Sequence, residues 1–312
     1  MNRRTFLSAT AAAICTKSLL NSEMAIAAPA QSTPVPDSKP FGLSLAQWSL
    51  NKRFFGRGGA EKLDNLEFAA IAKSLGFDAI EYVNQMFFDK ATNHDYLRQM
   101  KQRADDAGVK NLLIMCDREG RLGDPDEKQR TRAVENHYKW VEAAKLLGCH
   151  SIRVNASSKG SYEEQQKLAA DGLARLSDFA RDFGLNVIVE NHGGHSSNAR
   201  WLTRTILMAG RMNCGTLPDF GNFPSDADIY TSVKMMMPLA RAVSAKSRAF
   251  DDQGNETRID YHKMMAIVLD SGYRGYVGVE FEGAGMPEEE GIKATRDLLL
   301  KIRNDYPGQK RR

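Results

Sequence analysis

Three acidic residues stand where short apolar runs of this 312-residue chain end. The runs are Val187-Ile188-Val189-Glu190, Thr216-Leu217-Pro218-Asp219 and Val277-Gly278-Val279-Glu280. Neighbouring carboxylates repel one another and are costly to bury, so a site that they share needs a divalent cation or a cationic side chain. Oxygen ligands suit Mg²⁺ or Mn²⁺, whereas Zn²⁺ usually takes His or Cys. The alternative is that each acid separately caps a helix or pairs with a surface arginine.

The segments around these acids alternate between short apolar runs and longer amphipathic stretches. The apolar runs predict strands over residues 42–48, 79–83, 109–115, 151–155, 186–190, 214–218, 241–246 and 276–280. The amphipathic stretches predict helices over residues 61–75, 93–107, 127–147, 161–183, 198–211, 226–238, 258–271 and 287–304. Gly76, Gly148 and Gly184 each follow a helix, where glycine supplies the left-handed cap that turns the chain into the next strand.

Alternating strands and helices favour a parallel sheet with right-handed crossovers. Eight such units predict a single-domain α/β fold, a closed (β/α)8 TIM barrel over residues 41–306. The chain has no Gly-x-Gly-x-x-Gly between a strand and a helix, so a dinucleotide-binding fold lacks support. Barrels place their chemistry at the C-terminal ends of the strands, and side chains alternate along each strand. If Val189 and Val279 face the helices, Glu190 and Glu280 face the mouth of the barrel.

Composition excludes several classes of protein. Hydrophobic residues make up 42% of the chain, which is enough for a large core and excludes disorder as the main state. The 43 basic residues face 39 acidic ones without a basic stripe, which disfavours a nucleic-acid binder. Beyond residue 28 the cysteines are Cys116, Cys149 and Cys214, an odd number that predicts buried free thiols rather than a disulfide framework.

The two ends of the chain have compositions of their own. Arg3 and Arg4 precede an Ala-rich run that ends in small residues, which resembles a twin-arginine export signal over residues 1–28. Lys17 interrupts that run well short of a membrane span, so we expect cleavage and a periplasmic or secreted protein without stable membrane insertion. Residues 29–40 contain four prolines and predict a flexible linker, and residues 307–312 form a basic tail.

Three motifs together resemble the xylose isomerase-like TIM barrel family of sugar phosphate isomerases and epimerases. They are Glu190-Asn191-His192-Gly193-Gly194, Leu217-Pro218-Asp219-Phe220-Gly221-Asn222-Phe223 and Gly278-Val279-Glu280. The resemblance covers nearly all of residues 41–305. It implies a divalent metal at the barrel mouth held by Glu, Asp, His and Glu from strands five to eight, with the two glutamates also serving as acid and base. Mn²⁺ or Mg²⁺ is the expected cofactor, and Zn²⁺ or Co²⁺ is the alternative.

Carried over to this chain, the resemblance makes Glu190, Asp219 and Glu280 metal ligands, but the seventh strand departs from the pattern. Ser244 occupies the position where the family usually has a metal-binding His. His192, two residues after Glu190, is a candidate substitute ligand, and His195 in the same loop is a weaker one. Lys246 shares the parity of Ser244 and could neutralise the carboxylates or hold a substrate oxyanion, so we include it among the catalytic candidates.

Other strand ends provide candidate substrate-binding residues. Glu81 ends the second strand, and Arg153 and Asn155 end the fourth. Asn222 follows Asp219 by three residues, and Trp48 ends the first strand, where an aromatic ring could stack on a sugar. With His195, these complete the predicted substrate contacts; a structural salt bridge is the alternative role for Glu81, and a turn contact is the alternative for Asn222.

The leading hypothesis is a metal-dependent isomerase or epimerase of a sugar or keto-sugar. One glutamate would remove a proton alpha to a carbonyl, giving an enediolate, and the other would return it. A keto-glycoside lyase using the same proton removal is a close alternative, and a carbohydrate-binding barrel that lost its metal with the missing His is another. Metal-assisted phosphodiester cleavage is disfavoured, since it needs many His ligands and the chain has six His. The expected partner is a small sugar, and a homodimer is left open.

Overall fold

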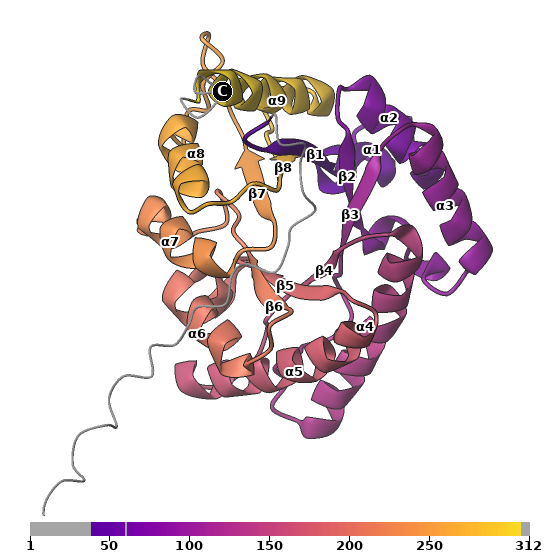
Figure 1. Ribbon diagram of the computed structural model, residues 1–312, viewed down its shortest axis with the longest axis vertical. Helices are drawn as coiled ribbons and strands as arrows, with labels where there is room; N and C mark the ends of the chain where they lie inside the picture. The colour runs from indigo at the N-terminus through magenta and orange to yellow at the C-terminus, as the bar shows by residue number, and fades with distance from the viewer. Residues whose placement is uncertain (1–38, 60, 307–312) are drawn as a thin grey trace, which may run out of the picture.

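The computed structural model describes residues 39–59 and 61–306, so the predicted signal, most of the linker and the basic tail lie outside the described residues. The described chain folds into a ring of parallel strands surrounded by helices (Figure 1). The strands are β1 (Gly42–Ala46), β2 (Ala79–Val83), β3 (Lys110–Met115), β4 (Ser151–Val154), β5 (Asn186–Glu190), β6 (Cys214–Leu217), β7 (Val243–Ser247) and β8 (Tyr276–Phe281).

The strands pair in the order β6-β5-β4-β3-β2-β1-β8-β7, and these neighbouring strands are all parallel. The last gap in the ring lies between β6 and β7. Backbone hydrogen bonds cross it, from Arg241 N to the Thr216 carbonyl at 3.0 Å and from Ser244 N to the Pro218 carbonyl at 2.9 Å. The predicted (β/α)8 barrel is therefore confirmed.

The helices lie outside the strand ring. They are α1 (Asn51–Phe54), α2 (Phe68–Ser74), α3 (His94–Asp106), α4 (Glu127–Leu147), α5 (Tyr162–Asp182), α6 (Ala199–Ala209), α7 (Ile229–Met236), α8 (Tyr261–Asp270) and α9 (Glu288–Asp305). Among the differences from the sequence prediction, two concern the first strand and the helix that follows it. The first strand ends at Ala46, and Trp48 lies in the 3-10 turn Gln47–Leu50. The helix expected from residue 61 begins at Phe68, after the 3-10 turn Asn65–Glu67 that Asp64 caps.

Short polar side chains set where the helices begin. At six helices the N-cap side chain accepts a hydrogen bond from a backbone N–H of the first turn, namely Asn93, Asp126, Ser161, Asn198, Asp228 and Asp260. Such caps satisfy N–H groups that have no partner within the helix. At the other end of α4, Gly148 has φ 80°, the left-handed conformation predicted for it. These caps fix the loops that lead into and out of the strands.

The apolar residues form two main layers. The larger layer packs between strands and helices and includes Val189 and Val279. A smaller cluster fills the inside of the barrel, where Ala46, Val83, Leu113, Met115, Ile188, Leu217 and Ala242 pack together. Because Ile188 points inward and Val189 outward, the next residue on β5, Glu190, points inward again. The inner cluster therefore forms an apolar layer beneath the C-terminal ends of the strands.

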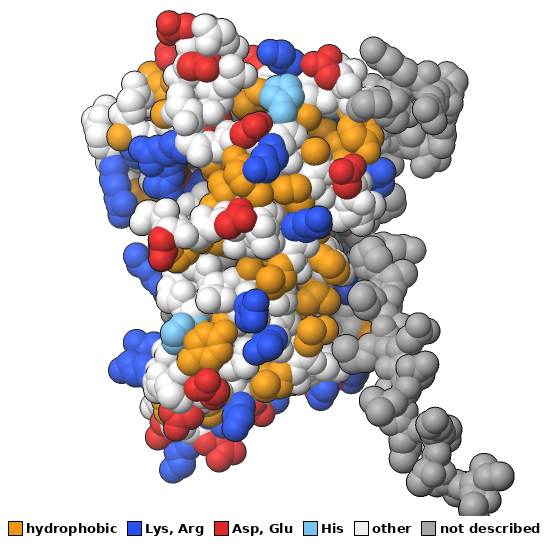
Figure 2. All heavy atoms as spheres, turned by 90° about the vertical axis from the view of Figure 1, so that its left-hand side faces the viewer, with side chains coloured by type: hydrophobic (Ala, Val, Ile, Leu, Met, Phe, Trp, Pro, Cys, Tyr) orange, Lys and Arg blue, Asp and Glu red, His pale blue; other side chains and the backbone are white. Residues whose placement is uncertain are grey.

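The outer surface on the α6–α8 side mixes charged and apolar side chains (Figure 2). The exposed large apolar side chains Leu207, Met208, Met212 and Met235 belong to α6, the turn after it and α7. Over the described residues, we find no helix with the length and apolar character needed to span a membrane.

Candidate active site

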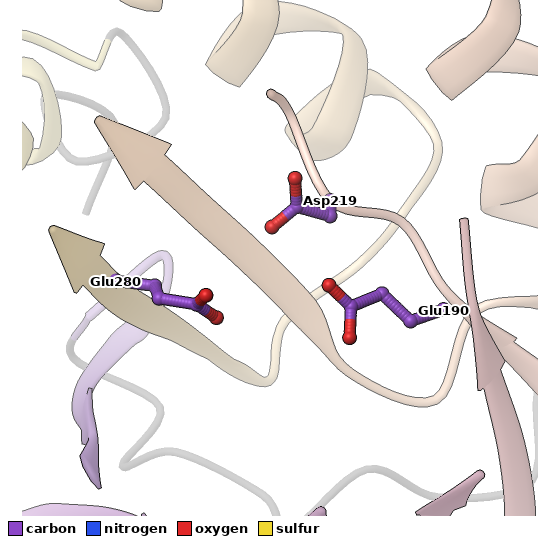
Figure 3. A group of neighbouring side chains, drawn as sticks. All are labelled: Glu190, Asp219 and Glu280. Atoms are coloured by element: carbon purple, nitrogen blue, oxygen red, sulfur yellow. The ribbon is translucent and has the colours of Figure 1, made fainter. Parts of the chain in front are cut away.

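Three carboxylates meet at the C-terminal end of the barrel. Glu190 is the last residue of β5, Glu280 is the penultimate residue of β8, and Asp219 follows β6 by two residues. One oxygen from each lies within 4.8 Å of the others, and all three residues are buried. The three side chains point toward one common space (Figure 3). The strand-end acids thus share one site rather than capping separate helices.

The Glu190 carboxylate is held from two sides. The Asn222 side-chain amide donates to Oε1 at 2.8 Å. Arg153 Nε lies 2.7 Å from Oε2, but its N–H is not directed at that oxygen, so the contact is an ion pair without an aligned hydrogen bond. Glu190 Oε2 therefore keeps acceptor capacity at the centre of the site.

The Asp219 carboxylate is positioned by its own loop and by β7. Gly221 N donates to Oδ1 at 2.8 Å, and the Ser244 hydroxyl donates to Oδ2 at 2.7 Å. Asn191 exchanges two further hydrogen bonds with the Asp219 backbone, at 3.0 Å and 2.8 Å. The loops after β5 and β6 are tied together at the point where their acids emerge.

Lys246 is the cation closest to the acids on the β7–β8 side. Its Nζ lies 2.8 Å from Glu280 Oε1 and 3.8 Å from Asp219 Oδ2, and it donates to the side-chain oxygen Oδ1 of Asn222 at 3.2 Å. Burial alone would lower the pKa of Lys246, but the carboxylates of Asp219, Glu280 and Glu190 raise it above the ordinary lysine value. Lys246 is therefore a permanent cation.

Two cations do not fully neutralise this cluster. Burial raises the pKa of Asp219 to about 7, with Lys246 opposing the shift and the charges of Glu190 and Glu280 adding to it. Burial also raises the pKa of Glu190, against the effect of Arg153. The raised pKa values mean that the ionised carboxylates are incompletely stabilised in this buried site, and a further cation would stabilise them.

The residues present fit a divalent metal ion with oxygen ligands. Three buried carboxylates from β5, the β6 loop and β8 converge, and the Ser244 hydroxyl adds a neutral oxygen 2.7 Å from Asp219 and 3.4 Å from Glu280. Among the described residues, this cluster includes no imidazole or thiolate. Such a donor set suits Mg²⁺ or Mn²⁺ better than Zn²⁺.

The predicted residues on β4 belong to a network with an acid that sequence reasoning missed. Arg153 Nη1 and the Asn155 side-chain amide both donate to Asp117 Oδ1, at 2.9 Å and 2.8 Å. Burial would raise the pKa of Asp117, but Arg153 and Asn155 lower it to about 2. Asp117 follows the end of β3 by two residues, the same spacing that places Asp219 after β6, and that spacing was the available signal.

The other predicted residues occupy the mouth or the interior. The indole N–H of Trp48 donates to Glu282, which also lies 3.3 Å from Lys246 Nζ. Glu81 is buried inside the barrel, where it accepts a hydrogen bond from the Ser44 hydroxyl at 2.6 Å. Its carboxylate lies against Gly278, at a distance that leaves no room for a Cβ atom there.

Neither loop histidine belongs to the group of three acids. His192 is exposed, and its backbone N–H donates to Ser196 Oγ at 3.1 Å. The ring of His195 packs against Tyr162 and Trp201, with centroid distances of 5.1 Å and 5.9 Å. The metal role of His192 and the substrate role of His195 stay predictions. Cys116, Cys149 and Cys214 are buried free thiols, as predicted.

The fold and the strand-end acids define a parallel (β/α)8 barrel with a buried acidic site at its mouth. The sequence matches the family described as "Xylose isomerase-like TIM barrel" over residues 69–302, and the chain belongs to that family. No curated protein sequence matches this chain significantly.

Several solved structures share the fold. D-psicose 3-epimerase from Clostridium cellulolyticum H10, determined with D-tagatose, has a TM-score of 0.69 and 14% identity, covering 84% of this chain and 99% of that one. The 3-keto-D-glucoside 4-epimerase from E. coli has a TM-score of 0.66 and 17% identity over 84% and 99%. The IOLI protein with a bound zinc atom has a TM-score of 0.68 and 17% identity over 85% and 99%. At these identities, the likeness is one of fold.

Proposed function

We propose that this protein is a metal-dependent isomerase or epimerase of a sugar or keto-sugar, working by proton transfer alpha to a carbonyl. The observation that carries the proposal is the convergence of Glu190, Asp219 and Glu280 within 4.8 Å at the barrel mouth. Sugar epimerases among the structures of the same fold support it, and the 3-keto-D-glucoside 4-epimerase supports the inclusion of keto-sugars.

Glu190, Asp219 and Glu280 would hold the cation, with Mn²⁺ or Mg²⁺ favoured by their oxygen donors. When bound, the ion supplies electrophilic polarisation of the substrate carbonyl. Ser244 holds Asp219 in place by its 2.7 Å hydrogen bond, and Asn222 does the same for Glu190 at 2.8 Å. These contacts fix the acids before substrate arrives, which lowers the cost of reaching the reactive geometry.

Glu190 and Glu280 reach the site from different strands and approach it from different directions (Figure 3). One of them would take the proton from the carbon beside the carbonyl, and the other would return it. Lys246 donates toward the same space from β7 and would bind the substrate oxygen on which negative charge develops. The apolar floor beneath the acids would exclude water from the proton-transfer step.

The test compares residues 29–312 of the wild type with the single variants Glu190→Gln and Glu280→Gln. Metal content is measured first, and exchange of the alpha proton in D₂O is then measured over a panel of ketoses and keto-sugars. Exposed Glu142→Gln on α4 is the matched control. We expect about one Mn²⁺ or Mg²⁺ per chain in the wild type and the control, and loss of both metal and exchange in the two site variants. Metal retained in both site variants would contradict the assignment.

The same experiment separates the alternatives. Release of an alcohol from a keto-glycoside would identify the lyase reaction, which shares the first proton removal. Sugar binding without exchange on any substrate would identify a binding barrel. We further propose export of the protein to the periplasm, on the basis of Arg3 and Arg4 and the Ala-rich run behind them.

A further inference from the structure

A cavity adjoins the carboxylate cluster on the β6–β7 side. Its volume is about 470 Å³, within the range of small-ligand pockets. Lys246 lines this cavity and its Nζ lies 2.8 Å from Glu280, so one side chain belongs both to the cavity wall and to the site of the proposed chemistry. A substituent of a substrate bound at the acids could extend into it without leaving the barrel mouth.

The charge of the cavity is positive. Arg248 and Arg258 line it together with Lys246. Arg258 is exposed, and among the described residues its guanidinium group forms no salt bridge within 4.0 Å. Arg248 has only a long contact, 3.7 Å from Nη2 to Glu282 Oε2. Two arginines therefore line the cavity, and in the described part of the chain their guanidinium groups have only this one ionic contact.

The one acidic residue that lines the cavity forms no salt bridge with the two arginines. Glu256 accepts hydrogen bonds at both oxygens from backbone N–H groups of its own loop. The donors are Arg248 and Ala249 at Oε1 and Arg258 and Ile259 at Oε2. Glu256 thus shapes the loop and, through it, places both arginines at the cavity wall.

Part of the cavity wall is apolar. Phe220, Phe223, Pro224 and Ile229 line it. A cavity lined by both apolar side chains and arginines fits a ligand with a weakly polar face and an anionic group. Guanidinium binds carboxylate in a two-pronged geometry that a neutral hydroxyl cannot match.

We propose that this cavity is a substrate subsite for an anionic group, and that the preferred substrates are sugar acids or glycosides that carry a carboxylate. The inference deepens the proposed function, on which it rests for the reaction at the acids. Arg248 and Arg258 would be the specificity-determining residues. Lys246 would lie between this subsite and the reacting carbon of the substrate.

The experiment is calorimetric titration of residues 29–312 with D-glucuronate, D-glucose and D-glucose 6-phosphate, with Mn²⁺ and again with EDTA. The repeat in EDTA separates binding at the arginines from chelation of the metal by the sugar carboxylate. The variants are Arg248→Gln and Arg258→Gln, and the control is Arg204→Gln on the exposed face of α6. Manganese stoichiometry is measured in parallel for every variant.

We expect D-glucuronate to bind at least about tenfold more tightly than D-glucose, and each cavity variant to lose about tenfold in D-glucuronate affinity without change in glucose affinity or manganese content. Equal affinity for the two sugars, no binding of either, or equal losses for both in the variants would overturn the proposal. Arginine-dependent binding of the phosphate sugar alone would overturn the carboxylate assignment and identify a phosphate subsite. Failure of metal binding with intact arginine-dependent glucuronate binding would count against the proposed reaction only.

Discussion

The Ser244 hydroxyl donates a hydrogen bond of 2.7 Å to Asp219 Oδ2, at the strand position where the resemblance led us to expect a metal-binding imidazole. Serine here orients a carboxylate instead of supplying nitrogen, so the donor set around the site consists of oxygens. The substitution therefore bears on which metal the site prefers rather than on whether the acids can converge.

We expect Ser244→His to shift metal preference from Mn²⁺ toward Zn²⁺ by about tenfold, because Zn²⁺ favours nitrogen ligands and the new ring would face Asp219 and Glu280. Competitive titration of the two ions measures the shift. Ser244→Ala is the control, since it removes the hydroxyl without adding nitrogen and should show no gain for Zn²⁺. An unchanged ratio of affinities in Ser244→His would contradict the prediction.

Lys246→Met is expected to separate metal binding from turnover. Removing a cation 2.8 Å from Glu280 should tighten Mn²⁺ binding by about tenfold, because the ion no longer competes with the ammonium group. Turnover should nevertheless fall by about a hundredfold or more, because the substrate oxygen loses its donor. Manganese titration and alpha-proton exchange on one preparation measure both; weaker metal binding with retained exchange would show that Lys246 only supports the structure.

The barrel and its three acids could be predicted because both depend on local patterns. Apolar runs of four to six residues that end on Glu190, Asp219 and Glu280 indicate strands with an acid at the mouth, and a buried strand fixes the parity of its side chains. The helix ends could also be predicted, because Gly148 and the polar N-cap residues form hydrogen bonds with residues nearby in the sequence.

Contacts across strands were not predictable from such patterns. Arg153 reaches Asp117 through the pairing of β3 with β4, and Ser244 reaches Asp219 through the closure between β6 and β7. These registers are set by the packing of the whole barrel, which no short stretch of sequence contains. Glu81 is a similar case, because parity pointed it inward, but only the registers of β2 with β1 and of β1 with β8 place it beside Gly278.

Export is tested by changing the two arginines alone. The variant with both Arg3→Lys and Arg4→Lys should remain full-length in the cytoplasm, because the twin-arginine route reads that pair, whereas the wild type should appear in the periplasm cleaved near residue 28. Cell fractionation and intact mass measure location and cleavage. Changing Arg311 and Arg312 to Lys is the control, and equal export of the Arg3–Arg4 variant would refute the assignment.

Glu81 should make the protein less stable as pH rises. Burial raises its pKa to about 8, the Ser44 hydrogen bond and the charge of Arg153 oppose the shift, and the charges of Glu280 and Glu190 add to it. Between the ordinary value near 4.5 and pH 8, the folded protein binds a proton that the unfolded chain has released. The stability that this proton contributes is complete below pH 4.5 and is lost as pH passes 8.

Glu81→Gln removes this titration and keeps the shape of the side chain. We expect the variant to gain stability over the wild type as pH rises from 5 to 9, by roughly 5 kcal/mol at most for a shift of this size. Urea unfolding in EDTA at several pH values measures the difference, and exposed Glu142→Gln should follow the wild type throughout. A stability difference between Glu81→Gln and wild type that stays constant from pH 5 to 9 would show that Glu81 is ionised in the folded protein across that range, and that its contact with Ser44 outweighs its burial.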